Sequence, residues 1–191
     1  MNELAHYMKA FQSLHINKTH GLKAPHKAVL LLAVIDQVEG GGISSPHVVL
    51  TDALVEGVNT IWSRYVGSST YFKPGICQPF FHMQHETFWR LVEREEAEDR
   101  ACGMAAESRL FGGFTGERKM LPRSGYSINS MRSAFAYAEM DEDLFLLLRN
   151  ADARAMLRVL LINTYLTNQP TRTMPNIAKL LAMLPLLTLA A

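Results

Sequence analysis

The sequence predicts an α+β fold that is mostly helical, with a winged-helix-like core and one small β-hairpin or sheet. Three observations favour this class. Over most of the chain, apolar residues recur at the three- and four-residue spacing of amphipathic helices. Residues 76–92 instead contain two short runs that are typical of strands. Glycine, proline and serine gather between these patterns, and the 191 residues fit one domain at 1–168 with an apolar tail at 169–191.

Three helices are expected in the first third of the chain. Apolar residues at helical spacing predict the first helix between residues 3 and 14. Pro25 suits the first turn of the second helix, which is apolar on nearly every side from Val29 to Ile35. A helix of that kind is buried at the centre of its domain. Thr51 is a suitable N-cap for the third helix, which is expected to run to Tyr65.

The β-structure is expected next. The runs Ile76–Met83 and Thr87–Val92 are separated by a few polar residues, which predicts a β-hairpin. Pro79 has no N–H and cannot donate to a strand ladder, so we expect it at a sheet edge or a bulge.

Helices return in the second half of the chain. Ser127, Asp141 and Asp152 each precede an apolar run with helical spacing, and each has a side chain that can cap a helix. The helix after Ser127 is expected to contain Phe135 and Tyr137. Together these patterns predict three helices beyond residue 126.

The composition indicates a folded chain with ample material for a core, since 48% of its residues are hydrophobic and 19% are charged. Cys77 and Cys102 are the only cysteines, too few for a disulfide framework or a cysteine-rich zinc site. The first residues lack the apolar stretch of a signal peptide, and no apolar run reaches the roughly 20 residues of a membrane span. We therefore expect a cytoplasmic protein with no membrane partner.

The formal net charge of +1 is low for a DNA-binding protein. Basic residues nevertheless gather in two regions, 1–30 and 109–132, on either side of an acidic run at 93–99. This arrangement suits a polarised surface, although ordinary solvated charge explains it equally well.

Signatures of metal binding and catalysis are weak. His82 and His85 lie three residues apart across the expected turn, and nothing nearby completes a tetrahedral zinc site. The glycines at 40–42 lack the lysine and serine of a phosphate-binding loop. No local pattern supports a serine or cysteine nucleophile. We expect no cofactor, no metal and no enzymatic activity.

The segment Ala24-Pro25-His26-Lys27 conflicts with helix electrostatics. A helix N-terminus carries partial positive charge and unpaired N–H groups, so cations there are unfavourable. An anion bound at this point would resolve the conflict, and such local conflicts often mark function. The simpler alternative is that Lys27 extends into solvent.

The segment Gln78-Pro79-Phe80-Phe81 is the second unusual feature. In a strand, Pro79 and Phe81 would share one face and offer a rigid apolar surface without a hydrogen-bond donor. The alternative is ordinary packing together with protection of a sheet edge.

Three segments, taken in order, resemble one protein family. They are residues 24–35 with the Ala-Pro-His-Lys start, residues 79–91 with Pro-Phe-Phe and Phe-Trp-Arg-Leu, and the helical region 127–165. Over about residues 1–166, the chain resembles the sulfur-binding domain that precedes the HNH nuclease module of McrA-type restriction endonucleases.

This resemblance implies binding to double-stranded DNA whose backbone carries a phosphorothioate, in which sulfur replaces one non-bridging oxygen. In that family the sulfur enters a shallow apolar cavity formed by a proline and the stems of a histidine and a basic residue. The matching positions are Pro79, His26 and Lys27, and the predicted sulfur-binding set adds Gln78 and Phe80 beside the proline. Gln78 stands where relatives often have an aromatic residue.

Sulfur is less strongly hydrated than oxygen, so placing it against carbon costs less free energy. The remaining affinity should come from contacts to phosphates and from loops in the groove. The candidate DNA-binding residues, chosen by charge and chemistry, are His20, Lys23, Tyr71, Lys73, Arg109 and Arg123.

An HNH site needs histidines, and none follows His85. We therefore expect recognition without cleavage by that route, with a nuclease subunit or domain as a possible partner. Two other functions fit the same residues. One is a winged-helix-like DNA-binding regulator without a sulfur preference, and the other is a helical interaction protein whose tail, Leu180–Leu189, binds a partner.

Overall fold

The computed structural model describes residues 3–101 and 126–167, and its fold is α+β and mostly helical. Helices make up 61% of the described residues. The described helices are α1 (Glu3–Gln12), α2 (His26–Glu39), α3 (Asp52–Tyr65), α4 (Cys77–His82), the 3-10 helix η1 (Met83–His85), α5 (Arg94–Ala101), α7 (Ile128–Ala134), α8 (Glu142–Arg149), α9 (Ala151–Leu161) and the π-helical turn η2 (Ile162–Leu166). The described strands are β1 (Lys18–Thr19), β2 (Leu22–Lys23), β3 (His47–Val48), β4 (Trp89–Glu93) and β5 (Phe135–Met140).

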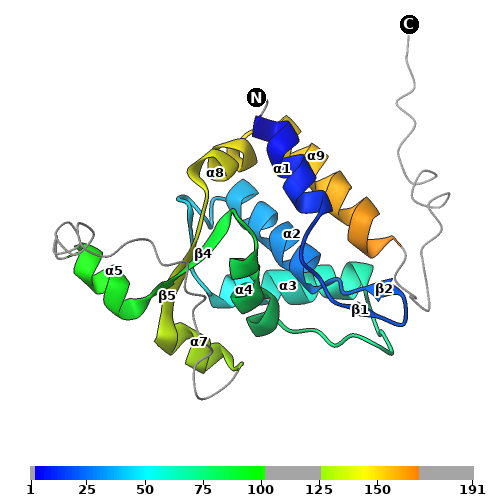
Figure 1. The fold of residues 1–191 in the computed structure, drawn as a ribbon, viewed down its shortest axis with the longest axis horizontal. Coiled ribbons are helices and arrows are strands. Elements are labelled where there is room, and N and C mark those ends of the chain that lie inside the picture. Colours follow the sequence, from blue (N-terminus) through cyan, green and yellow to red (C-terminus); the bar gives the residue numbers. More distant parts are fainter. Residues whose placement is uncertain (1–2, 102–125, 168–191) are drawn as a thin grey trace, which may run out of the picture.

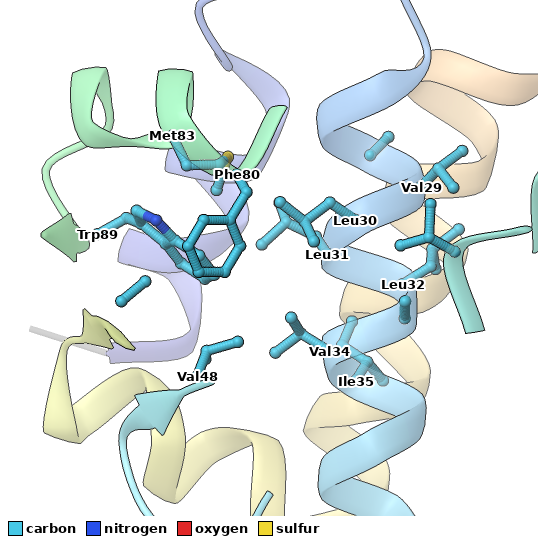
Figure 2. Packing of buried hydrophobic residues seen from close by; sticks show 14 of the residues in the cluster. Val29, Leu30, Leu31, Leu32, Val34, Ile35, Val48, Phe80, Met83 and Trp89 are labelled. Atoms are coloured by element: carbon cyan, nitrogen blue, oxygen red, sulfur yellow. The ribbon is translucent and has the colours of Figure 1, made fainter. Parts of the chain in front are cut away.

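Helix α2 forms the centre of the fold, as its apolar sequence predicts. Its residues from Lys27 to Ile35 are all buried, and α3, α4, α8 and α9 pack against it (Figure 1). Figure 2 shows Leu30 and Leu31 on the side of α2 that faces Phe80 and Trp89. The core therefore joins α2 to the segment that follows α3.

The N-terminal caps predicted at Thr51 and Ser127 are confirmed. The Thr51 hydroxyl accepts a hydrogen bond from the N–H of Leu54 at 3.2 Å. Ser127 forms a reciprocal capping box with Ser130. At these two positions, a short polar side chain before an apolar helix marks where the helix begins.

The side-chain caps predicted for the last two helices do not form, although Asp141 occupies the predicted N-cap position of α8. The carboxylate of Asp141 precedes α8 but accepts a hydrogen bond from the Tyr7 hydroxyl at 3.0 Å instead of capping the helix. Helix α9 is capped by Asn150, whose side chain accepts from the N–H of Ala153 at 3.0 Å, and Asp152 lies in its first turn. A nearby tyrosine and a better placed amide explain both differences.

The first predicted strand, Ile76–Met83, instead contains helix α4 (Cys77–His82) and the start of η1, which corrects the predicted β-hairpin. Helix α4 buries Cys77, Pro79, Phe80 and Phe81. Cys77, Phe80 and Phe81 have the spacing of one helical face, and the first backbone hydrogen bond joins the N–H of Phe80 to the carbonyl of Ile76. Pro79 lies in this first turn, where an N–H has no intrahelical partner, so the missing donor costs nothing. An apolar run this short does not by itself distinguish a buried helix from a strand.

The second predicted strand exists, but it pairs with a distant segment. Strand β4 is antiparallel to β5, and β5 also pairs with β3, giving the order β3-β5-β4. Phe135 and Tyr137, predicted to be helical, belong to β5. Both edges of β5 pair with strands that are distant in the sequence. The local spacing of apolar residues therefore cannot predict this strand.

A second, two-stranded sheet lies ahead of α2. Strands β1 and β2 are antiparallel and joined by His20 and Gly21, whose φ angles are +51° and +78°. Two left-handed residues in a two-residue loop are the geometry of a tight hairpin turn. Within residues 3–101 and 126–167, every helix is too short or too polar to span a bilayer.

Candidate functional site

A hollow of about 430 Å³ opens where the start of α2 meets α4 and η1. We call it the α2–α4 hollow. It combines ring nitrogens, amides and apolar carbon, and its lining residues are His15, Ile16, Asn17, Ala24, His26, Lys27, Gln78, Pro79, His82 and His85.

The fold brings four of the predicted sulfur-binding residues to this hollow. His26 and Lys27 open α2, while Gln78 and Pro79 lie in the first turn of α4. The packing of α4 against α2 joins the two pairs, which are separated by about 50 positions in the sequence. Phe80 does not reach the hollow, because one step along a helix turns its ring into the core beside Trp89 (Figure 2).

Lys27 does not extend into solvent, which corrects the simpler alternative. Its side chain is 7% exposed, and its Nζ contacts the Glu86 carboxylate at 2.5 Å. Burial lowers the pKa of Lys27, and the hydrogen bond and charge of Glu86 act in the opposite direction. Glu86 therefore compensates the ammonium group, and Lys27 adds its aliphatic stem to the hollow.

Glu86 also connects this pair to the hollow's rim. Its Oε1 accepts a hydrogen bond from the backbone N–H of His15 at 2.9 Å, and its Oε2 lies 3.2 Å from His15 Nδ1. We did not predict this residue. A lysine within an otherwise apolar helix does signal that a buried carboxylate is needed, but not which one.

His26 is held between a loop and two aromatic rings. Its Nε2 donates to the backbone carbonyl of Lys73 at 2.9 Å, and its ring lies 4.9 Å from Trp62 and 5.9 Å from Phe72, centroid to centroid. Burial lowers the pKa of His26, so the ring is neutral near pH 7. The same contact anchors the backbone of Lys73, whose side chain is exposed.

His82 and His85 also line the hollow. Their rings are stacked with centroids 5.7 Å apart, and the Tyr126 hydroxyl lies 2.7 Å from His82 Nε2. Burial lowers the pKa of His82, with further lowering by His85 and Lys27. Tyr126 was not predicted, because nothing in the local sequence links it to residue 82.

The predicted DNA-binding residues fall into different environments. His20, at the β1–β2 turn, and Tyr71 are both exposed, and their ring centroids are 4.9 Å apart. Lys23 is turned towards η2, with its Nζ 3.5 Å from the Thr164 carbonyl and 5.0 Å from the centre of the Tyr165 ring. Arg109 and Arg123 lie outside the described residues, as does the tail at 169–191.

No protein-family model matches this chain, and no curated protein matches it either. Among residues 3–101 and 126–167, no three histidine, cysteine, aspartate or glutamate side chains are grouped to hold a metal ion. Chemically, the α2–α4 hollow offers an apolar proline and lysine stem, imidazole rings and the two amides of Asn17 and Gln78. Such a lining suits a weakly hydrated anion better than a strongly hydrated one.

Proposed function

We propose that this protein binds double-stranded DNA carrying a phosphorothioate, with the sulfur placed in the α2–α4 hollow against Pro79. The observation that carries this proposal is the convergence of His26, Lys27, Gln78 and Pro79 on one open hollow. These are the residues at which the sequence resembles the sulfur-binding family.

The charge state of the hollow supports a preference for sulfur over oxygen. Because Glu86 compensates Lys27, the site has no buried, uncompensated ammonium to attract any phosphate indiscriminately. A phosphate oxygen entering the hollow would lose water without gaining a full ion pair. Sulfur loses less hydration and gains contact with the Pro79 ring and the Lys27 stem.

Exposed groups beside the hollow supply candidates for backbone and groove contacts. Lys73 is presented by the loop that His26 anchors, and the His20–Tyr71 ring pair lies on the neighbouring hairpin and loop. Flat rings and cations of this kind suit sugar, base and phosphate contacts. The proposed role is recognition, with cleavage left to a nuclease subunit or domain.

The deciding experiment compares one duplex with and without a single phosphorothioate linkage. We expect wild-type protein to bind the modified duplex more tightly at the same salt concentration, measured by fluorescence anisotropy. Equal affinity for the two would point to a winged-helix-like DNA-binding regulator and would overturn the sulfur proposal. Absence of salt-dependent DNA binding would favour a protein-interaction role.

Pro79→Ala sharpens this experiment. Alanine is compatible with the first turn of a helix, so the variant should remain folded. It removes ring carbon from the sulfur contact, which should weaken binding of the modified duplex by about 1 kcal/mol. Affinity for the unmodified duplex should barely change.

Pro46→Ala is the matched control, since Pro46 lies before β3 and does not line the hollow. Circular dichroism checks that both variants are folded. A folded Pro79→Ala variant that keeps the full sulfur preference would show that the sulfur does not contact this ring.

A further inference from the structure

Four of the seven histidines in the chain line the α2–α4 hollow. Two of them are engaged with groups that only accept hydrogen bonds: His26 with a carbonyl and His15 with the Glu86 carboxylate. His82 differs, because the group at its Nε2 is the hydroxyl of Tyr126. A hydroxyl can donate, so Nε2 of His82 can be the acceptor in its contact.

The Tyr126–His82 contact favours one tautomer of His82. A phenol is a strong donor and a neutral imidazole nitrogen a strong acceptor, so donation from the Tyr126 hydroxyl to Nε2 is the favoured direction of this contact. Burial raises the pKa of Tyr126, which keeps the hydroxyl protonated. A neutral ring that accepts at Nε2 carries its hydrogen on Nδ1. The stacked ring of His85 further restrains the orientation of His82.

His82 also lies at the right place on its helix. Pro79 and His82 are three residues apart on α4, so they share a face, and both line the hollow. A phosphorothioate carries its sulfur and a non-bridging oxygen on the same phosphorus atom. With the sulfur against Pro79, the oxygen needs a hydrogen-bond donor close to Pro79 in the hollow.

We propose that His82 is a specificity-determining residue whose Nδ1–H donates to the non-bridging oxygen of the bound linkage, and that Tyr126 is the positioning residue that fixes this tautomer. This inference rests on the proposed function. It assigns the sulfur of the linkage to Pro79 and the non-bridging oxygen to His82, two residues on the same face of α4.

A pH dependence follows from the same geometry. An anion beside His82 stabilises the protonated ring, so binding takes up a proton and affinity rises as the pH falls through the titration of His82. The other titratable or charged groups around the hollow are His15, His26, Lys27, His85, Glu86 and Tyr126. The contribution of His82 is isolated by comparing variants at this one position.

Two conservative variants separate the two ring nitrogens. The amide nitrogen of His82→Asn takes the place of Nδ1, whereas that of His82→Gln takes the place of Nε2. We expect His82→Asn to retain most of the affinity for the modified duplex and to lose the His82 part of the pH dependence between pH 5.5 and 8. His82→Gln should weaken binding about tenfold, the size expected when a hydrogen bond to a charged group is lost.

Tyr126→Phe tests the positioning role. The binding-competent tautomer then becomes only a fraction of the population, so affinity should fall a few-fold without loss of fold. His47→Asn and Tyr137→Phe are matched controls, because these stacked rings lie on the β3–β5 sheet and do not line the hollow. Both controls should bind as wild type does.

Nitrogen-15 NMR of the wild-type protein tests the tautomer without any substitution. We expect Nδ1 of His82 to be protonated, Nε2 to be unprotonated, and the Nδ1 resonance to shift when the modified duplex binds. A proton on Nε2, or equal affinity of His82→Asn and His82→Gln, would overturn the inference. If wild type showed no sulfur preference, the proposed function would fail first, and the two failures are therefore distinguishable.

Discussion

The α2–α4 hollow and the β4–β5 surface both gather charged side chains, but they neutralise them in different ways. On the sheet, Arg90 contacts Glu96 at 2.8 Å and also contacts Glu139, while Arg100 contacts the same two carboxylates at 3.0 and 3.5 Å. At the hollow there is a single buried pair, Lys27–Glu86, and the lining around it consists largely of histidines, amides and a proline.

This difference shows why charge along the sequence is a poor guide to function in this protein. The acidic run at 93–99 suggested a polarised surface, yet Glu96 in that run forms ion pairs with two arginines. Charges that pair with each other on a surface contribute to structure and leave little for a ligand. The hollow differs from the sheet surface because it has open volume next to Lys27, whose charge Glu86 compensates.

The largest expected effect concerns the buried pair. Glu86→Ala leaves the Lys27 ammonium buried without its carboxylate, which should lower the free energy of unfolding by about 3–5 kcal/mol. Urea denaturation at pH 7 measures this change. Glu96→Ala on the sheet is the matched control and should cost about 1 kcal/mol or less, because its partners are partly exposed.

A double variant tests the cause of that loss. Lys27→Met combined with Glu86→Leu removes both charges, and most of the stability lost in Glu86→Ala should return. If the double variant were as unstable as the single one, the loss would come from packing or from the His15 contact instead of the unpaired ammonium.

A smaller effect is expected for the lysines near the hollow. Lys73→Ala should weaken both modified and unmodified duplexes similarly and reduce the slope of log affinity against log salt by about one unit. Lys23→Ala should change the slope less, since Lys23 is turned towards the Thr164 carbonyl and the Tyr165 ring. Salt titrations of both variants measure the difference. If both variants kept the slope of the wild-type protein, the DNA would lie on another face.

The smallest effect belongs to the sheet network. Burial raises the pKa of Glu139, but its hydrogen bond to Arg90 and the nearby charges of Arg90, Arg100 and His47 outweigh burial and hold that pKa below its usual value. A depressed folded-state pKa contributes stability that is present above the unfolded value of about 4.3 and is lost as the pH falls through the folded value.

Glu139→Gln should therefore reduce stability at pH 7 by about 1 kcal/mol or less, and the difference from wild type should vanish at strongly acidic pH. Thermal unfolding from pH 7 to pH 2 measures this convergence. DNA affinity should not change, and a change would mean that the sheet surface takes part in binding.

The sequence by itself determined the elements whose signals are local. The all-round apolar character of residues 29–35 predicted the buried helix α2, and Thr51 and Ser127 predicted two helix starts. The sequence also singled out His26, Lys27, Gln78 and Pro79, which the fold brings to one hollow. Local propensity, capping and helix electrostatics depend on residues within one or two turns, so they can be read along the chain.

Tertiary structure alone decided the features that depend on distant partners. Strand β5 exists because β3 and β4 pair with its two edges, and α4 is a helix because its buried face packs against α2. The choice of Glu86 as the partner of Lys27, and of Tyr126 as the partner of His82, joins residues separated by more than 40 positions. Such contacts are set by packing and by the cost of leaving buried polar groups unpaired, and no local pattern encodes them.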